Sequence, residues 1–101
     1  MDIIQEALTI PGFTSREFLV ELQRLARNRP LAIEIGAFKG RSTVVLAEAI
    51  IGVVYSIDIW DTRMYDPSMT SGINNWDECG AYRAFLQNMR HCNVHHHVIP
   101  M

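Results

Sequence analysis

The arrangement of apolar residues along the chain predicts a strand-helix-strand unit between residues 31 and 58. Two short apolar runs, 31–35 and 53–58, flank a turn with two glycines and a largely apolar segment, 42–51. Continuous apolar runs of this length are typical of parallel strands whose two faces are both covered. A helix between two such strands packs on the sheet as a right-handed crossover.

The segments on either side of this unit predict helices and one more strand. Apolar residues at helical spacing over 2–13 predict a short helix or arm, and Thr14 is the expected N-cap of a second helix that ends before Pro30. The expected buried face of that second helix consists of Phe18, Leu19, Leu22, Leu25 and Ala26. Toward the C-terminus, a helix over 79–90 and a third strand over 94–101 are predicted.

Together these elements predict an α/β fold, a partial three-layer Rossmann-like architecture with three parallel strands in the order 3-2-1. We expect residues 1–30 to form an N-terminal helical segment and residues 31–101 to form a Rossmann half-domain. Residues 59–78 form a long polar and aromatic connection, which in a compact domain is either functional or mobile. Its aromatic residues either line a ligand or cap the core: Trp60, Tyr65 and Trp76.

Length and composition narrow the class of protein. The 101 residues suffice for one domain, and 49% hydrophobic with 20% charged residues is ordinary for a globular protein. The formal net charge of −2 and the lack of a strongly basic cluster argue against a nucleic-acid or anionic-membrane partner. No segment reaches the roughly 18 apolar residues of a membrane span. Cys79 and Cys92 are expected as free thiols, and we expect a cytoplasmic protein.

The glycine turn at residues 36–40 is the strongest candidate for a ligand site. Gly36 and Gly40 allow a tight turn and a close approach to a helix N-terminus, where N–H groups attract a carboxylate. A dinucleotide site usually needs a glycine where Phe38 stands, so this residue argues against NAD and FAD, and less against a ligand with a ribose and no phosphate, such as S-adenosylmethionine. Asp58 lies at the spacing of about 20 residues expected for an acid that binds the ribose.

Two of the candidate residues also have structural interpretations. Asp58 is either the ribose ligand or an acid that caps the turn after the second strand. Glu34 lies within an apolar strand, where an unsatisfied carboxylate is costly. Its carboxylate either accepts a hydrogen bond from the ammonium group of the ligand or holds the turn through backbone N–H groups.

Two other ligand classes fit the sequence poorly. A P-loop needs four residues between its glycines and a lysine after the second, whereas this turn has three residues there and Arg41. His95, His96 and His97 are adjacent in the predicted third strand. Because alternate side chains of a strand point to opposite faces, these three are not expected to converge on a metal ion.

With both motifs identified, residues 31–101 resemble the N-terminal part of a class I S-adenosylmethionine-dependent methyltransferase. The first motif is Glu-Ile-Gly-Ala-Phe-Lys-Gly-Arg-Ser-Thr at 34–43, and the second strand ends in Asp-Ile-Trp at 58–60. The stretch 82–89, followed by Asn-Val at 93–94, resembles the second helix and the entry to the third strand of that family.

The resemblance implies S-adenosylmethionine as the cofactor. The implied cofactor-binding residues are Glu34, Gly36, Ala37, Phe38, Gly40, Ser42, Thr43, Asp58, Ile59 and Trp60. Asp58 is implied to contact the ribose, and Ile59 or Trp60 the adenine. The family continues into an acceptor-binding and catalytic half, so we expect a methyltransferase domain that lacks this half and has no assigned catalytic residue. The alternative is a non-catalytic remnant that acts as a dimerisation or interaction module.

The predicted strand order leaves the strand at 31–35 at an edge of the sheet. An exposed apolar edge promotes aggregation unless something covers it. We therefore expect a homodimer in which the first strands pair across a two-fold axis, or coverage of that surface by residues 1–28.

Overall fold

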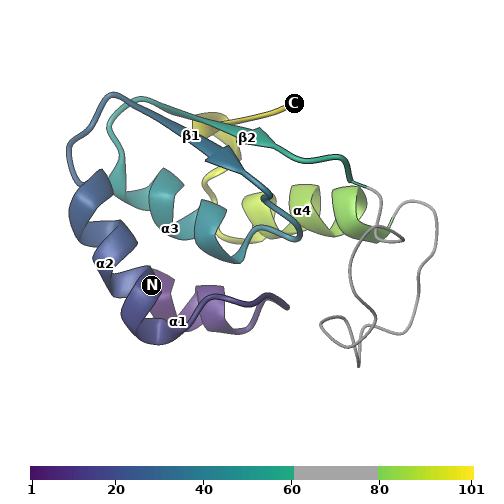
Figure 1. The fold of residues 1–101 in the computed structure, drawn as a ribbon, viewed down its shortest axis with the longest axis horizontal. Coiled ribbons are helices and arrows are strands. Elements are labelled where there is room, and N and C mark those ends of the chain that lie inside the picture. Colours follow the sequence, from purple (N-terminus) through teal and green to yellow (C-terminus); the bar gives the residue numbers. More distant parts are fainter. Residues whose placement is uncertain (61–79) are drawn as a thin grey trace.

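The computed structural model describes residues 1–60 and 80–101. Its elements are α1 (Ile3–Leu8), α2 (Arg16–Ala26), β1 (Leu31–Ile35), α3 (Arg41–Ala49), β2 (Val53–Ile57), α4 (Gly80–His91), the 3-10 helix η2 (His95–His97) and β3 (Val98–Pro100). The strands form one parallel sheet in the order β1-β2-β3, and the helices lie on one face of it (Figure 1). This is the predicted partial Rossmann-like α/β fold, represented by the sheet and one helical layer.

The register of the strands brings the carboxyl ends of β1 and β2 together. Ile35 pairs with Ile57, and the N–H of Gly36 donates to the carbonyl of Ile57 at 2.7 Å. The pairing of β2 with β3 begins at Val54 and Val98. The glycine turn and Asp58 therefore leave the sheet at the same edge, which is where parallel α/β sheets bind ligands.

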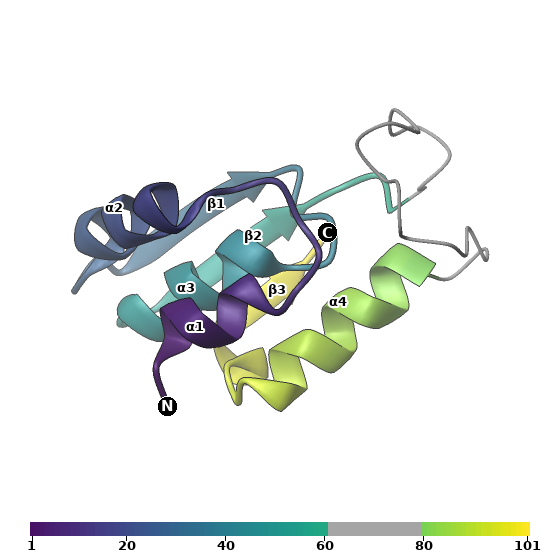
Figure 2. The same ribbon diagram turned by 90° about the horizontal axis from the view of Figure 1, so that it is seen from below.

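One core joins the N-terminal helices to the strand-helix-strand unit. Its centre is α3, whose Val44 and Val45 are fully buried. Figure 2 shows α1 and α4 on the helical side of the molecule together with α3. Core residues from the other elements include Ile3, Ala7, Leu19, Val54, Phe85 and Met89. Residues 1–30 thus contribute to the same core as the sheet.

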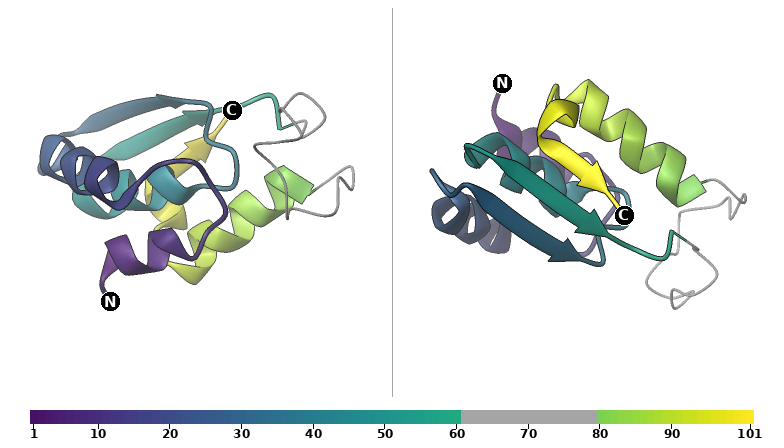
Figure 3. Two further views of the ribbon diagram at one scale, coloured as in Figure 1. Left: turned by 60° about the horizontal axis from the view of Figure 1, so that its bottom comes forward. Right: turned by 90° about the horizontal axis from the view of Figure 1, so that it is seen from above.

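The opposite face of the sheet has no helix over it among residues 1–60 and 80–101 (Figure 3, right). On this face Leu31, Ile33 and Ile35 of β1 are 50%, 63% and 83% exposed. β1 is also an edge strand, because its one partner in the described sheet is β2. The predicted apolar edge strand is confirmed. Continuous apolar strands also predict that both faces of the sheet are covered, and in the described residues helices cover one face.

The start and the buried face of α2 differ from the prediction. Its N-cap is Ser15, whose Oγ accepts a hydrogen bond from the N–H of Phe18 at 3.2 Å, and not Thr14. Leu19 and Ala26 are buried, but Phe18 and Leu25 are 55% and 51% exposed. The sequence of α2 offers two overlapping apolar stripes at helical spacing, and contact with α3 selects the stripe that contains Leu19.

The third strand is shorter than predicted. It begins at Val98, and the residues before it form η2, so the alternation argument for the three histidines does not apply to this structure. The imidazole Nδ1 of His97 lies 2.8 Å from the carbonyl oxygen of Gly52. Of the residues predicted for the connection, Tyr65 and Trp76 lie outside the described residues, as does Cys79.

Candidate functional site

The glycine turn contains three residues with left-handed backbone geometry, Gly36 (φ +86°), Phe38 (φ +51°) and Gly40 (φ +99°). The two glycines serve different purposes. A Cβ on Gly36 would meet no heavy atom of the described residues within 4 Å, whereas a Cβ on Gly40 would overlap Cε of Met89. Gly40 therefore permits close packing of the turn against α4, and Gly36 faces open space.

Asp58 connects this turn to the end of β2. Its Oδ2 accepts a hydrogen bond from the N–H of Phe38 at 2.7 Å, and its Oδ1 accepts one from the N–H of Trp60 at 2.8 Å. The predicted pairing of the turn with an acid about 20 residues later is thus a direct contact. The structure shows the turn-capping role of Asp58, and the ribose contact stays a prediction.

Glu34 lies below the turn and is held by hydroxyl groups. It accepts hydrogen bonds from Ser42 and Thr43 at the start of α3, and Ser56 Oγ lies 3.5 Å from its Oε1. Glu34 has a structural role, as one of the two interpretations predicted, but its donors are hydroxyl groups and not the predicted backbone N–H groups. Thr43 has no exposed surface, so its hydroxyl positions Glu34 and does not face a ligand in this structure.

The two candidates for the adenine contact differ in accessibility. Trp60 packs edge-on against the rings of Tyr82 and Phe85, with centroid distances of 5.0 and 4.8 Å, and its Nε1 donates to the carbonyl of Met101 at 3.2 Å. It caps the core beside α4. Ile59 is 65% exposed next to Asp58, so it is the better placed of the two to contact a ligand.

No pattern in the sequence indicates that the arm between α1 and α2 belongs to this site. A cavity of about 70 Å³ opens beside the turn, lined by residues 11–14, residues 36–38, Arg41 and Ser42. Phe13 stacks on Phe38 with a centroid distance of 5.6 Å and an interplanar angle of 21°. The available signals were the helix break at Pro11 and Gly12 and the cation at the start of α3, and neither specifies a long-range contact.

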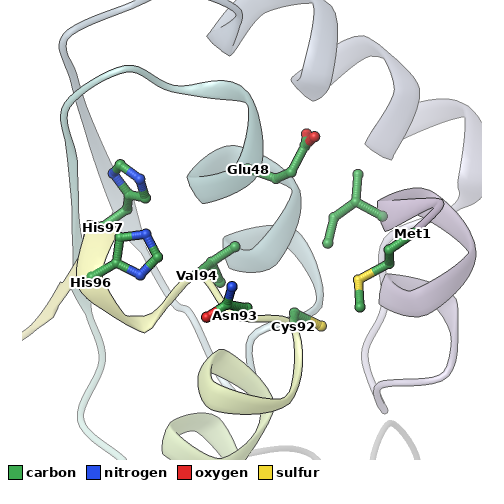
Figure 4. A pocket seen from close by; sticks show the side chains of 8 residues that line it. Met1, Glu48, Cys92, Asn93, Val94, His96 and His97 are labelled. Atoms are coloured by element: carbon green, nitrogen blue, oxygen red, sulfur yellow. The ribbon is translucent and has the colours of Figure 1, made fainter.

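A second cavity, of about 390 Å³, lies away from this turn (Figure 4). It is lined by Met1, Ile3, Glu48, Cys92, Asn93, Val94, His96 and His97. Burial and the nearby charge of Glu6 raise the pKa of the Cys92 thiol, which makes it a poor nucleophile at neutral pH. Within residues 1–60 and 80–101, no three His, Cys, Asp or Glu side chains are arranged to hold a metal ion. In the same residues, no helix is long and apolar enough to span a membrane.

Neither a protein-family model nor the sequence of a curated protein matches this chain. Solved structures do match it. TomG, an O-methyltransferase of Streptomyces achromogenes solved in complex with SAM, gives a TM-score of 0.65 at 20% identity over 99% of this chain and 42% of its own. Cofactor-bound Rv0187 from MTB gives 0.64 at 19% identity, over 98% and 40% of the two chains.

A precorrin 8W decarboxylase of Methanobacterium thermoautotrophicum also matches, with a TM-score of 0.59 at 22% identity over 92% of this chain and 41% of its own. The chain therefore spans about two-fifths of the length of the solved structures it matches. At these identities the likeness establishes the fold. The chain has the fold of the N-terminal part of a class I S-adenosylmethionine-dependent methyltransferase.

Proposed function

We propose that this chain binds S-adenosylmethionine at the edge of the sheet where β1 and β2 end, as the cofactor-binding part of a methyltransferase. The observation that carries the proposal is the contact between Asp58 and the N–H of Phe38, beside the open space at Gly36. The shared fold supports it, since TomG binds SAM and has the same architecture. When bound, the cofactor supplies a methyl group on a sulfonium for transfer to a nucleophile.

The chain's own residues have distinct tasks in this proposal. The open turn at Gly36 admits the methionine end of the cofactor, close to the N-terminus of α3. No side chain of the described residues caps the N–H groups there, and these groups attract the carboxylate of the cofactor. Asp58 accepts hydrogen bonds from the ribose hydroxyls, and Ile59 packs against the adenine. Glu34 keeps the start of α3 in place through Ser42 and Thr43.

The positive φ of Phe38 and its stacking on Phe13 bear on the choice of ligand. In a dinucleotide site a glycine at this position lets the backbone approach the pyrophosphate. Here a phenylalanine ring occupies the position and is covered by a second ring. The turn therefore favours a cofactor without a pyrophosphate over NAD or FAD.

Calorimetric titration with S-adenosylmethionine, S-adenosylhomocysteine and NAD tests the proposal. Wild-type protein is expected to bind the first two with micromolar affinity and NAD not at all. Asp58→Asn removes a charged acceptor and is expected to weaken binding about tenfold or more. Glu48→Gln is the matched control, because Glu48 lines the other cavity. The absence of binding at millimolar ligand, with protein shown to be folded, would refute a cofactor site.

A second candidate function, self-association, is suggested by the edge of β1, which has no strand partner other than β2 among the described residues, and by the exposed apolar side chains of β1. A second copy of the chain is the proposed partner, with the two β1 strands paired across a two-fold axis. Such pairing satisfies the backbone groups of the edge strand and extends the sheet. Self-association in this way is compatible with cofactor binding. The proposed dimer pairs the two β1 strands along their length, whereas the proposed cofactor site lies at the glycine turn after the end of β1.

A further inference from the structure

Arg41, the first residue of α3, holds both ends of the arm between α1 and α2. Its Nε donates to the carbonyl of Ile10 at 2.7 Å, and its Nη1 donates to the carbonyl of Thr14 at 2.8 Å. Gly12 lies on the aliphatic stem of the same side chain, because a Cβ there would be 3.1 Å from Cβ of Arg41. Hydrogen bonds from a guanidinium are charge-assisted, so this one side chain fixes the path of five residues.

The arm held in this way forms a wall of the cavity beside the glycine turn. In Figure 2 the chain between α1 and α2 passes the end of β1, where the turn begins. Residues 11–14 line one side of the cavity, and Gly36, Ala37 and Phe38 line the other. The stacked rings of Phe13 and Phe38 join the two sides.

One polar atom of this wall has no hydrogen-bond partner among residues 1–60 and 80–101. Thr14 Oγ1 is buried, and it makes no hydrogen bond to any of the residues that the structure describes. A buried hydroxyl without a partner is destabilising, and most such groups in proteins are paired. Thr14 lines the cavity, so a ligand in the cavity can supply the missing partner.

We propose that Arg41 is a positioning residue that holds the arm as a wall over the methionine end of the cofactor site, and that the Thr14 hydroxyl donates to the cofactor's carboxylate. This inference rests on the proposed function and assigns specificity within that site. The guanidinium of Arg41 adds a positive charge to the same cavity wall, which favours a carboxylate there. The arm therefore distinguishes cofactors that carry an amino-acid end from nucleosides that lack it.

The test compares two ligands that share the adenosine part. S-Adenosylhomocysteine has the amino-acid end, and 5′-methylthioadenosine lacks it. Calorimetry on Arg41→Ala and on Thr14→Val is expected to show about tenfold weaker binding of S-adenosylhomocysteine and unchanged binding of 5′-methylthioadenosine. Arg41→Lys is expected to restore part of the loss. Arg24→Ala is the control, because Arg24 pairs with Glu21 on the surface of α2.

Thr14→Val provides a variant that keeps the fold intact. The substitution removes an unpaired hydroxyl at constant shape, so the thermal midpoint without ligand is expected to stay the same or rise while affinity for S-adenosylhomocysteine falls. A purely structural role of the arm predicts equal losses for both ligands in Arg41→Ala, and no loss in Thr14→Val. That result would overturn the inference and leave the proposed function standing. If wild-type protein binds neither ligand, the proposed function fails and the inference fails with it.

Discussion

Oδ2 of Asp58 lies 2.7 Å from the backbone nitrogen of Phe38, and this hydrogen bond spans 20 residues of sequence. It joins the segments that follow the carboxyl ends of the adjacent parallel strands β1 and β2. The carboxylate thus holds a turn with three left-handed residues in the conformation that leaves Gly36 open. Asp58 therefore has a structural role before any ligand is considered, and the proposed ribose contact would use the same carboxylate.

Asp58→Ala is therefore expected to destabilise the protein even without cofactor. The N–H groups of Phe38 and Trp60 lose a charged acceptor, which costs about 1–3 kcal/mol in the free energy of unfolding. Asp58→Asn keeps one acceptor oxygen and is expected to lose less. Urea denaturation measures both values, with Glu48→Gln as the control. Equal stability of Asp58→Ala and wild type would show that the two hydrogen bonds contribute nothing to the turn.

The two glycines of the turn are expected to respond differently to alanine. Gly36→Ala adds only the strain of a left-handed residue, about 1–2 kcal/mol, because no atom of residues 1–60 or 80–101 lies near the new Cβ. Gly40→Ala adds the same strain and a collision with the buried Met89, so it is expected to cost more. In a Met89→Ala background, the cost of Gly40→Ala is expected to fall, but to stay above that of Gly36→Ala because Cδ2 of Phe85 lies 3.2 Å from the same Cβ. An unchanged cost in that double-mutant cycle would rule out the collision.

Self-association is expected to depend on the open face of β1. Ile33 is 63% exposed on this strand, and a lysine there places a charge within any interface that β1 forms. We expect wild type to be a dimer by light scattering and Ile33→Lys to be a monomer. Ile51→Lys is the matched control, since Ile51 is 65% exposed and lies outside the strands. A wild-type monomer at the same concentration would refute the proposed dimer.

The thiol of Cys92 is expected to make stability depend on alkaline pH. Burial and the charge of Glu6 raise its pKa in the folded protein, so the folded state holds this proton more tightly than the unfolded chain. The resulting stabilisation is complete below the unfolded pKa of about 8.5 and is lost as pH rises through the folded pKa. The measurement is the difference in the free energy of unfolding between Cys92→Ser and wild type, obtained by urea denaturation at pH 7 and at pH 10. No narrowing of that difference at the higher pH would contradict the assignment.

Sequence patterns within residues 31–58 predicted the glycine turn and the position of Asp58 beside it. The apolar runs of β1 and β2, the glycines between them and Asp58 at the next strand end fix the main-chain geometry, and the structure has them as predicted. The choice between capping acid and ribose ligand could not be made from spacing, because both roles put Asp58 in the same place.

Long-range contacts account for the rest. Arg41 reaches Ile10, 31 residues earlier, through side-chain bonds to carbonyl oxygens that leave no pattern in the sequence. The exposed Phe18 has a similar cause, because helix packing selected one of two apolar stripes. The third strand is short because the three histidines form a 3-10 helix before it, and the His97 imidazole of that helix contacts the distant carbonyl of Gly52.

Amide chemical-shift mapping with S-adenosylhomocysteine shows whether the glycine turn binds the cofactor. At saturating ligand, we expect the amide signals of Gly36, Phe38 and Ile59 to shift together, while that of Gly52, at the amino end of β2, does not. Glycine amides are resolved from most others, so Gly36 and Gly52 form an internal pair of site and control. Unmoved signals at Gly36 and Phe38, or shifts confined to the cavity around Cys92, would contradict a cofactor site at the glycine turn.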